Sequence, residues 1–372
     1  MIRVLHVLPW IGGGGVERRR MAIAKQLTQG IEHRFFTLSA HGEPAKHIRA
    51  AGAELVCASA RNLKSHRPFL DLARVVRDYR PHIIHGAVFE GVILAATVGR
   101  LMRVPVVIGE ETSDATNRSP RGHALFRGLS MLTDRTVAIS PQVVDNLKNI
   151  TKIREDKIHL IMNGVDPLDP ATPAARHTAR KKFGLPQDAL VLGTMSRLVD
   201  DSHKRVSDAI RAMPAVVAQV PHAHLLVCGD GRARPMLEAL ATELGVQDHV
   251  TFAGTVVPQE GFDAMDVFVH VAQREGFGLA VAEAAFCALP MVTTGVGGIA
   301  SIILPNKSAR VVPVGDVQAI AHAAIAFAQD AELRTRFGQA GRAYAMEHFS
   351  STRYVRDVEA LYRTLYAEIK AT

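Results

Sequence analysis

Cysteine is scarce in this chain of 372 residues, which contains three, Cys57, Cys228 and Cys287. They lie far apart, each within an apolar run, and match neither a disulfide framework nor a set of metal ligands. We therefore expect three buried core thiols in a reducing compartment, and no metal site.

Aromatic residues and long apolar runs are scarce as well. Aromatics make up 5% of the chain, which leaves few stacking platforms for single-stranded nucleic acid, so we expect no nucleic-acid partner. No apolar stretch approaches the roughly 20 residues of a membrane-spanning helix. The first residues, MIRVLHVLP, lead directly into a strand pattern and are too short for a signal peptide. A soluble cytoplasmic protein is the resulting expectation.

Positive charge is in excess, with 44 Lys and Arg against 36 Asp and Glu and a formal net charge of +8. The basic residues are scattered, and their excess suits a phosphorylated substrate or an anionic membrane surface. Hydrophobic residues make up 48% of the chain, enough for sizeable cores, and the length accommodates two α/β domains.

Short apolar runs alternate with segments of helical period, which is typical of repeated βαβ units. The pattern predicts strands at Val4–Leu8, His33–Leu38, Glu54–Cys57, His82–His85, Val104–Ile108, Arg135–Ile139 and Lys157–Ile161, and again at Leu190–Met195, His224–Cys228, Val250–Phe252, Val267–His270, Met291–Thr293 and Arg310–Val312. We therefore expect an α/β fold with doubly wound parallel sheets, whose ligands bind beyond the carboxyl ends of the strands.

The stretch 167–186 contains four prolines and no β-rich run, which predicts a linker with one helix. We expect two Rossmann-like domains, residues 1–170 and 171–348, with a cleft between them that suits a two-substrate reaction. The helix within 349–372 is expected to pack back on the N-terminal domain.

Four glycines, Gly12 to Gly15, join the first strand to the first helix. Glycines at this point leave backbone amides free for an anion at the helix N-terminus, although a plain tight turn would use them too. A dinucleotide-binding site would need a further glycine where Glu17 stands and an acidic residue where Ser39–Ala40 stand. An NAD-dependent dehydrogenase therefore fits poorly.

Arg197 and Lys204 flank the loop after the first strand of the second half. They could converge on a pyrophosphate and stabilise it as a leaving group, or they could be solvated surface cations.

Two glutamates stand in REGFGLAVAEAAFCALPMVTTGVGG, Glu275 in a glycine-rich loop and Glu283 on the helix that follows. We expect this helix to begin around Phe277–Leu279, so that the loop amides face an anion. Glu283 would then accept hydrogen bonds from a ribose diol, and Glu275 would face a sugar hydroxyl or ring. Isolated carboxylates more often lie at the surface, but the glycines and the apolar helix disfavour that here.

Together these segments resemble the retaining glycosyltransferases of family four, which share the two-domain GT-B fold. The resemblance covers nearly the whole chain and is carried by GGGGVE, AISPQVVDNL, IMNGVD, SRL with HK, VCGDGRARPMLEAL, TFAGTV and EGFGLAVAEA. The last segment, followed by ALPMVTTGVGG, is the most specific of them.

The resemblance implies an acceptor-binding N-terminal domain and a donor-binding C-terminal domain. Arg197 and Lys204 would hold the donor diphosphate, Glu283 the ribose and Glu275 the sugar. The remaining contacts that it implies, largely through the backbone, are Gly14, Gly15, Gly229, Gly231, Thr255, Val256, Gly276, Phe277, Gly278 and Leu279.

The implied reaction transfers a hexose from a nucleoside diphosphate sugar, UDP-sugar before GDP-sugar, to a saccharide or lipid-linked acceptor. It retains the anomeric configuration, requires no metal or cofactor, and belongs to cell-surface polysaccharide or glycolipid synthesis. The usual proposal for such enzymes is front-face attack, in which the departing phosphate takes the acceptor proton. A nucleotide-sugar epimerase of the same fold and a non-catalytic nucleotide-sugar-binding regulator are the alternatives.

One departure from the family pattern is GEETS after the fifth strand, where members commonly carry His. Glu111, with Glu110 as the alternative, takes that position. A carboxylate beside the transferred sugar could act as a base or interact with an oxocarbenium-like centre. We therefore predict that Glu111 belongs to the active site.

A basic, partly apolar helix is predicted in RSPRGHALFRGLSML, with Arg118, Arg121, His123 and Arg127 among Leu125, Phe126 and Leu129. One interpretation is contact with anionic lipid headgroups or a lipid-linked acceptor, at the inner face of the cytoplasmic membrane. The other is an ordinary helix with an apolar core face.

Overall fold

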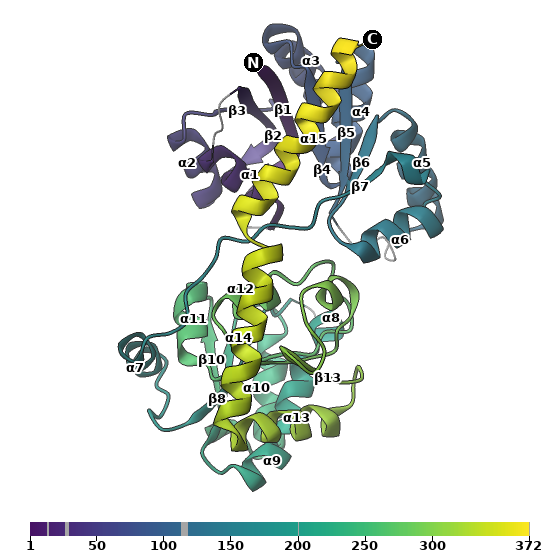
Figure 1. Cartoon of the computed structure of the whole chain (residues 1–372). Helices are drawn as coiled ribbons and strands as arrows, with labels where there is room; N and C mark the ends of the chain where they lie inside the picture. The colour runs from purple at the N-terminus through teal and green to yellow at the C-terminus, as the bar shows by residue number, and fades with distance from the viewer. Residues whose placement is uncertain (13–14, 27–29, 113–117, 200, 372) are drawn as a thin grey trace. The chain divides into compact units, whose positions relative to one another are not determined.

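The computed structural model describes residues 1–12, 15–26, 30–112, 118–199 and 201–371, with the backbone alone for Gly15, Glu17 and Arg18. The chain divides into two compact units. The first comprises Met1–Asp166 and Phe349–Thr372, and the second comprises Pro167–His348 (Figure 1). The chain thus leaves the first unit and returns to it with its last helix.

The first unit contains a seven-stranded parallel sheet in the order β3-β2-β1-β4-β5-β6-β7. Its strands are β1 (Ile2–Ile11), β2 (Ile31–Ala40), β3 (Glu54–Cys57), β4 (Ile83–Ala87), β5 (Val106–Glu111), β6 (Arg135–Ala138) and β7 (Ile158–Leu160). Its helices are α1 (Gly15–Lys25), α2 (Gly42–Ala50), α3 (Arg67–Tyr79), α4 (Val88–Leu101), α5 (Pro120–Met131), α6 (Pro141–Asn149) and α15 (Ser351–Ala371).

The second unit contains a six-stranded parallel sheet in the order β10-β9-β8-β11-β12-β13. Its strands are β8 (Leu190–Met195), β9 (Ala223–Cys228), β10 (Val250–Gly254), β11 (Val267–His270), β12 (Met291–Thr293) and β13 (Ala309–Val311). Its helices are α7 (Pro173–Lys182), α8 (Asp201–Lys204), α9 (Val206–Gln219), α10 (Arg234–Glu243), α11 (Pro258–Ala264), α12 (Leu279–Phe286), α13 (Val317–Gln329) and α14 (Ala331–His348).

Central strands such as β9 and β11 are apolar over most of their length because both faces of the sheet are covered. Every residue of β9 is buried, for example. Helix α3 is amphipathic and buries Leu72, Val76 and Tyr79 along one stripe. Ser140 caps α6 by accepting the Val143 N–H. The predicted α/β class with two doubly wound parallel sheets is therefore confirmed.

One helix of the first unit comes from the far end of the chain. Helix α15, yellow in Figure 1, packs on one face of the first sheet. Its residues Val358, Leu361 and Leu365 share a core with Val4 and Ile108. This face of the sheet is thus closed by residues that follow the whole second unit in sequence.

The cysteines differ in one respect from expectation. Cys228 and Cys287 are buried, but Cys57 is exposed, because it ends β3, which lies at the edge of its sheet. Among the described helices, none is both long and apolar enough to pass through a bilayer.

In each sheet the strand order reverses beside the first strand of the unit. The reversal lies between β1 and β4 in the first sheet and between β8 and β11 in the second. Loops diverge at such a switch point and leave a crevice at the carboxyl ends of the strands, where doubly wound proteins bind their ligands.

Candidate functional site

The loops after β8, β9 and β10 lie side by side at one edge of the second sheet. The Ser196 N–H donates to the carbonyl of Cys228 at 3.0 Å, and the Gly229 N–H donates to that of Gly254 at 2.7 Å. Gly229 has a φ of +136°, and a Cβ there would overlap the carbonyl oxygen of Ser196. Glycine is therefore required at this position by backbone packing.

The residues predicted near the nucleobase and the diphosphate lie on these same loops. Arg197 follows Ser196 and its side chain is exposed. Gly231 follows β9, and Thr255 and Val256 follow β10. The fold thus gathers at one edge residues that are up to 59 positions apart, 256 − 197.

Lys204 and Glu275 are in direct contact on either side of the switch point. The Nζ of Lys204, which ends α8, lies 2.5 Å from Oε2 of Glu275, in the loop after β11. His270 Nε2 lies 3.3 Å from the same oxygen, and the Gly276 N–H donates to Oε1 at 3.1 Å. The carboxylate therefore has three donors around it.

These donors decide the charge of Glu275. Burial by itself would raise the pKa of its carboxyl, but the hydrogen bond from His270 and the charge of Lys204 outweigh burial and lower the pKa to about 2. Glu275 is therefore ionised at any pH near neutrality, and it can accept hydrogen bonds but not donate a proton.

The backbone of Glu275 is held from the loop after β12. The Gly298 N–H donates to the Glu275 carbonyl at 3.1 Å. Gly297 has a φ of +58°, and a Cβ there would overlap that same carbonyl oxygen. Gly297, Gly298 and His270 thus position Glu275, and sequence reasoning gave none of them a role. The signals were present, namely a histidine ending the strand before Glu275 and the glycine pair of TTGVGG.

Helix α12 begins at Leu279, within the range expected for it, and Gly278 is its N-cap. Phe277 is buried, and the amides from Gly276 to Leu279 lie at the N-terminal end of this helix. The helix dipole favours an anion there. Glu283 lies one turn further on and is buried, with a 7% exposed side chain.

In the first unit, Glu111 ends β5 and is buried. Its Oε2 lies 2.7 Å from Nη2 of Arg118, and the Arg118 guanidinium lies over the rings of Phe126 at 4.5 Å and Phe89 at 5.0 Å. The predicted Gly14 lies outside the described residues, and Gly15 begins α1.

Glu110, the alternative to Glu111, lies in the core of the first unit. Its carboxylate oxygens lie 2.7 Å from Arg19, 2.6 Å from Arg20 and 3.2 Å from His85. Burial by itself would raise the pKa of Glu110, but the two guanidinium groups outweigh burial and hold the pKa well below its usual range. Arg20 also donates to the Tyr354 hydroxyl of α15 at 2.8 Å. The surroundings of Glu110 are those of a structural ion cluster.

The structure bears on the two interpretations of the basic segment around α5, lipid contact and an ordinary core face. Phe126 and Leu129 are buried, and Arg118 is engaged with Glu111. Arg121, Leu125 and Arg127 are exposed. For Phe126 and Leu129 the interpretation as an apolar core face is therefore correct.

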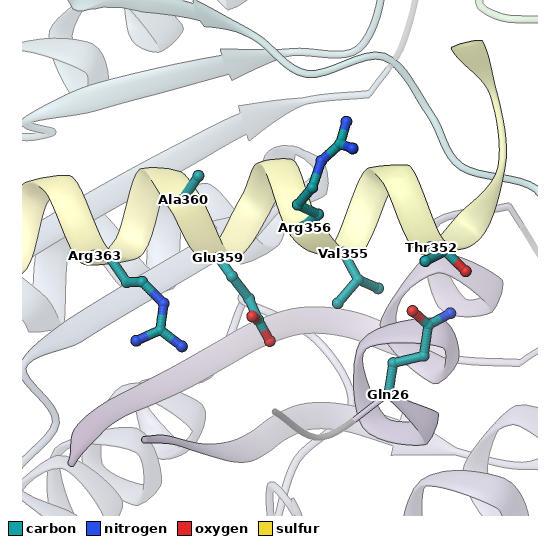
Figure 2. Close-up of a pocket in the computed structure, with 7 residues that line it drawn as sticks. All are labelled: Gln26, Thr352, Val355, Arg356, Glu359, Ala360 and Arg363. Atoms are coloured by element: carbon teal, nitrogen blue, oxygen red, sulfur yellow. The ribbon is translucent and has the colours of Figure 1, made fainter. Parts of the chain in front are cut away.

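Two grooves border α15. One, of about 390 Å³, lies between α1 and α15 (Figure 2). Its lining residues are Gln26, Thr352, Val355, Arg356, Glu359, Ala360 and Arg363. Figure 2 shows Val355 and Glu359 pointing from α15 toward the α1 side. The other, of about 410 Å³, lies between β7 and α15. Neither groove contains a residue of the predicted donor site.

Within the ranges that the structure describes, no three His, Cys, Asp or Glu side chains are grouped so as to hold a metal ion. The predicted site residues Arg197, Lys204, Glu275 and Glu283 all follow strands of the second sheet. Cations together with carboxylates suit an organic anion that also carries hydroxyl groups.

Two family models match the chain. Residues 13–167 match Glycosyltransferase Family 4, and residues 175–344 match Glycosyl transferases group 1, so that together the models span most of the sequence. The chain belongs to the family 4 glycosyltransferases. This membership confirms the resemblance to family four that was found in the sequence.

Curated relatives of this family 4 chain act on different substrates. N-acetyl-alpha-D-glucosaminyl L-malate synthase of Bacillus anthracis is 28% identical over 70% of this chain and 68% of its own length. A GDP-mannose-dependent monoacylated alpha-(1-6)-phosphatidylinositol monomannoside mannosyltransferase of Corynebacterium glutamicum is 33% identical over 50% of this chain and 51% of its own length. The chain thus spans between half and about two thirds of these relatives.

Solved structures match over nearly the whole chain. The Anabaena protein HepE in complex with UDP has a TM-score of 0.86, with 17% identity over 98% of this chain and 100% of its own. WaaG, a glycosyltransferase involved in lipopolysaccharide biosynthesis, has a TM-score of 0.72, with 17% identity over 96% of this chain and 99% of its own. The family 4 chain therefore has the GT-B fold.

Proposed function

We propose that the protein is a retaining hexosyltransferase that moves a sugar from a nucleoside diphosphate sugar to a saccharide or lipid-linked acceptor. The observation that carries the proposal is the meeting of Lys204 and Glu275 across the switch point of the second sheet, in a family 4 chain. UDP-sugar is the first donor candidate, because HepE is solved with UDP and with UDP-glucose. GDP-sugar is the second, after the GDP-mannose-dependent relative.

In this proposal Arg197 and Lys204 bind the diphosphate. Their fixed charge stabilises the negative charge that develops as the bond between the sugar C1 and the phosphate oxygen breaks. The acceptor oxygen forms the new bond to the sugar C1 on the face of the sugar from which the phosphate leaves. The proton of the acceptor hydroxyl passes to the departing phosphate. No protein side chain then needs to change its protonation state.

The remaining contacts of the proposal are those that the family resemblance implies. Glu283 binds the ribose, and Glu275, which is ionised, accepts hydrogen bonds from the sugar hydroxyls. The amides from Gly276 to Leu279 hold sugar and phosphate. In this proposal the base contacts Gly229, Gly231, Thr255 and Val256, and the family resemblance implies that Gly14 and Gly15 contact the phosphates.

We assign Glu111 to the active site as the residue that lies beside the transferred sugar, held by Arg118. We also propose a role in cell-surface polysaccharide or glycolipid synthesis, with peripheral contact at the inner face of the cytoplasmic membrane. Supporting this is the 31% identity, over 59% of this chain, to a lipopolysaccharide core biosynthesis glycosyltransferase of Rhizobium meliloti.

The decisive test is a donor panel. One of UDP, GDP and ADP, together with its sugars, is expected to raise the melting temperature, because a ligand that binds only the folded state stabilises it. Replacing Lys204 by Met is expected to lower the rate of nucleoside diphosphate release by about 10²-fold or more. The matched control is Lys182→Met, since Lys182 forms an exposed ion pair with Glu260 at 2.7 Å in the same unit.

Four results would count against the proposal. The first is that no nucleotide raises the melting temperature, and the second is that Lys204→Met releases nucleoside diphosphate as fast as the control. Conversion of the donor sugar without any acceptor would indicate an epimerase. Proton NMR of the product reports the anomeric configuration, and inversion would overturn the retaining mechanism.

A further inference from the structure

Lys204 already has a partner within the protein. Its Nζ lies 2.5 Å from Oε2 of Glu275, and the two side chains are 28% and 16% exposed. A pair this shielded is screened by salt less than one at the open surface. The cation that the proposed function assigns to the diphosphate is therefore neutralised by a carboxylate of the same chain.

Glu275 keeps other donors if Lys204 leaves it. The His270 Nε2 lies 3.3 Å from Oε2, and the Gly276 N–H donates to Oε1. A carboxylate can only accept, so Nε2 must carry the proton in this contact. The His270 ring is 4% exposed and stacks on Phe268 with 5.9 Å between ring centres. Its packing fixes the direction of the hydrogen bond to Glu275.

The Lys204 side chain is the movable member of the group. Its backbone is anchored next to the Glu275 loop, because the neighbouring His203 carbonyl accepts the Gln273 N–H at 2.9 Å. A lysine side chain has four methylenes and a point charge that can be rotated between acceptors. Lys204 can therefore change partner without moving the loop.

We propose that Lys204 is paired with Glu275 in the donor-free protein and exchanges this carboxylate for the donor diphosphate when the donor binds. His270 holds Glu275 in place during the exchange. This partner exchange rests on the proposed function. It adds that the Glu275 carboxylate competes with the donor diphosphate for Lys204. The intact donor offsets the competition through its sugar contact with Glu275. The product nucleoside diphosphate has no sugar, so the returning Lys204–Glu275 pair favours its release.

The test is Glu275→Gln, assayed by calorimetric titration with UDP, GDP and ADP at fixed ionic strength. The variant is expected to bind the recognised nucleoside diphosphate at least about threefold more tightly than the unsubstituted protein, although it transfers sugar more slowly. The corresponding nucleoside, which has no phosphate, should bind both proteins equally.

A thermodynamic cycle separates partner exchange from plain charge repulsion. In a Lys204→Met background the gain from Glu275→Gln is expected to vanish, since the competed cation is gone. Glu260→Gln is the charge-matched control, because it opens another Lys–Glu pair of the same unit, at 2.7 Å, and should leave nucleotide binding unchanged. Should Glu275→Gln fail to fold, Glu275→Asp withdraws the carboxylate by one methylene and should also tighten binding.

The outcomes distinguish the two proposals. Unchanged or weaker nucleoside diphosphate binding by Glu275→Gln overturns the exchange and leaves the proposed function intact. An equal gain in the Lys204→Met background also overturns the exchange, since repulsion would then explain it. If the unsubstituted protein binds none of the three nucleotides, the donor assignment fails and the exchange fails with it.

Discussion

Glu110 and Glu111 are neighbours at the end of β5, yet they have unrelated surroundings. Successive side chains of a strand point to opposite faces of the sheet. Glu110 shares its face with Ile108 and meets Arg19 and Arg20 from α1. Glu111 points to the other face and meets Arg118. Their roles therefore separate into fold stability and a candidate place in the active site.

We expect Glu110→Gln to lower the free energy of unfolding by about 3–5 kcal/mol, because it leaves two buried guanidinium groups without their carboxylate. Glu111→Gln should cost less, since the Arg118 guanidinium keeps its two ring contacts. It should instead reduce turnover at least about tenfold. Urea unfolding and the rate of nucleoside diphosphate release measure the two effects.

A reversed pattern would refute this division. Normal turnover by Glu111→Gln removes Glu111 from the active site. An unfolding curve for Glu110→Gln that coincides with that of the unsubstituted protein would show that the core cluster contributes little to stability.

At the scale of elements, the segment Asn163–Gly164–Val165 binds the start of the last helix through hydrogen bonds of its backbone. The Val165 N–H donates to the carbonyl of Phe349 at 2.8 Å, and Arg353 Nη2 donates to the carbonyl of Asn163 at 2.9 Å. These contacts attach the start of α15 to the first unit. The Asn-Gly-Val element of the family resemblance thus contacts helix α15. This contact accounts for the element without any role in ligand binding.

The ends of α4 and α5 form an exposed apolar surface. Arg100 Nε donates to the Leu132 carbonyl at 2.6 Å, which brings the two ends together. Leu101 and Met131 nearby are 76% and 74% exposed, and Arg103 is also exposed. Apolar side chains among basic ones suit an anionic bilayer surface.

We expect the protein to co-sediment with vesicles that contain phosphatidylglycerol, and not with phosphatidylcholine vesicles. Met131→Glu should weaken binding about fivefold, because each charge near an anionic surface contributes about 1 kcal/mol. Met236→Glu, at a methionine of the second unit that is 48% exposed, is the control. Binding that is absent, or equally weakened by both substitutions, would contradict membrane contact through this surface.

At the scale of the whole molecule, the titratable groups of the core make the first unit sensitive to acid. Burial lowers the pKa of His33 and of His85 to about 4, and that of His6 well below its usual value. A histidine with a depressed folded pKa takes up its proton more readily in the unfolded chain. Its stabilising contribution is therefore lost as pH falls from about 6.5 toward 4.

We expect the free energy of unfolding to fall over that range by up to about 1.4 kcal/mol per pH unit for each such histidine. Loss of the Glu110 contribution follows below about pH 4.5, in the same direction. Trp10, the single tryptophan, lies in the first unit, so its fluorescence reports the unfolding of that unit. His33→Gln should reduce the pH dependence, whereas the exposed His322→Gln should not. A flat profile between pH 7 and pH 5 would contradict this account.

The sequence by itself determined the repeated strand and helix pattern and the pairing of a glycine-rich loop with a carboxylate helix at Glu275 and Glu283. These features depend on residues near one another in the chain, whose spacing sets periodicity, turns and helix starts. The family resemblance added Arg197 and Lys204 as partners of one ligand. The tertiary structure then brought Lys204 against Glu275.

Other features were decided by the tertiary structure alone. Lys204 and Glu275 are 71 residues apart, and Arg20 reaches Tyr354 across 334 residues. Such contacts depend on strand order and on the return of α15, which local patterns do not encode. For the same reason the burial of Glu110 could not be predicted, and the strand-end position of His270 did not by itself reveal its contact with Glu275. The types of residue that the candidate site uses could be predicted from the loop sequences. Which charged groups contact one another was determined by the tertiary fold.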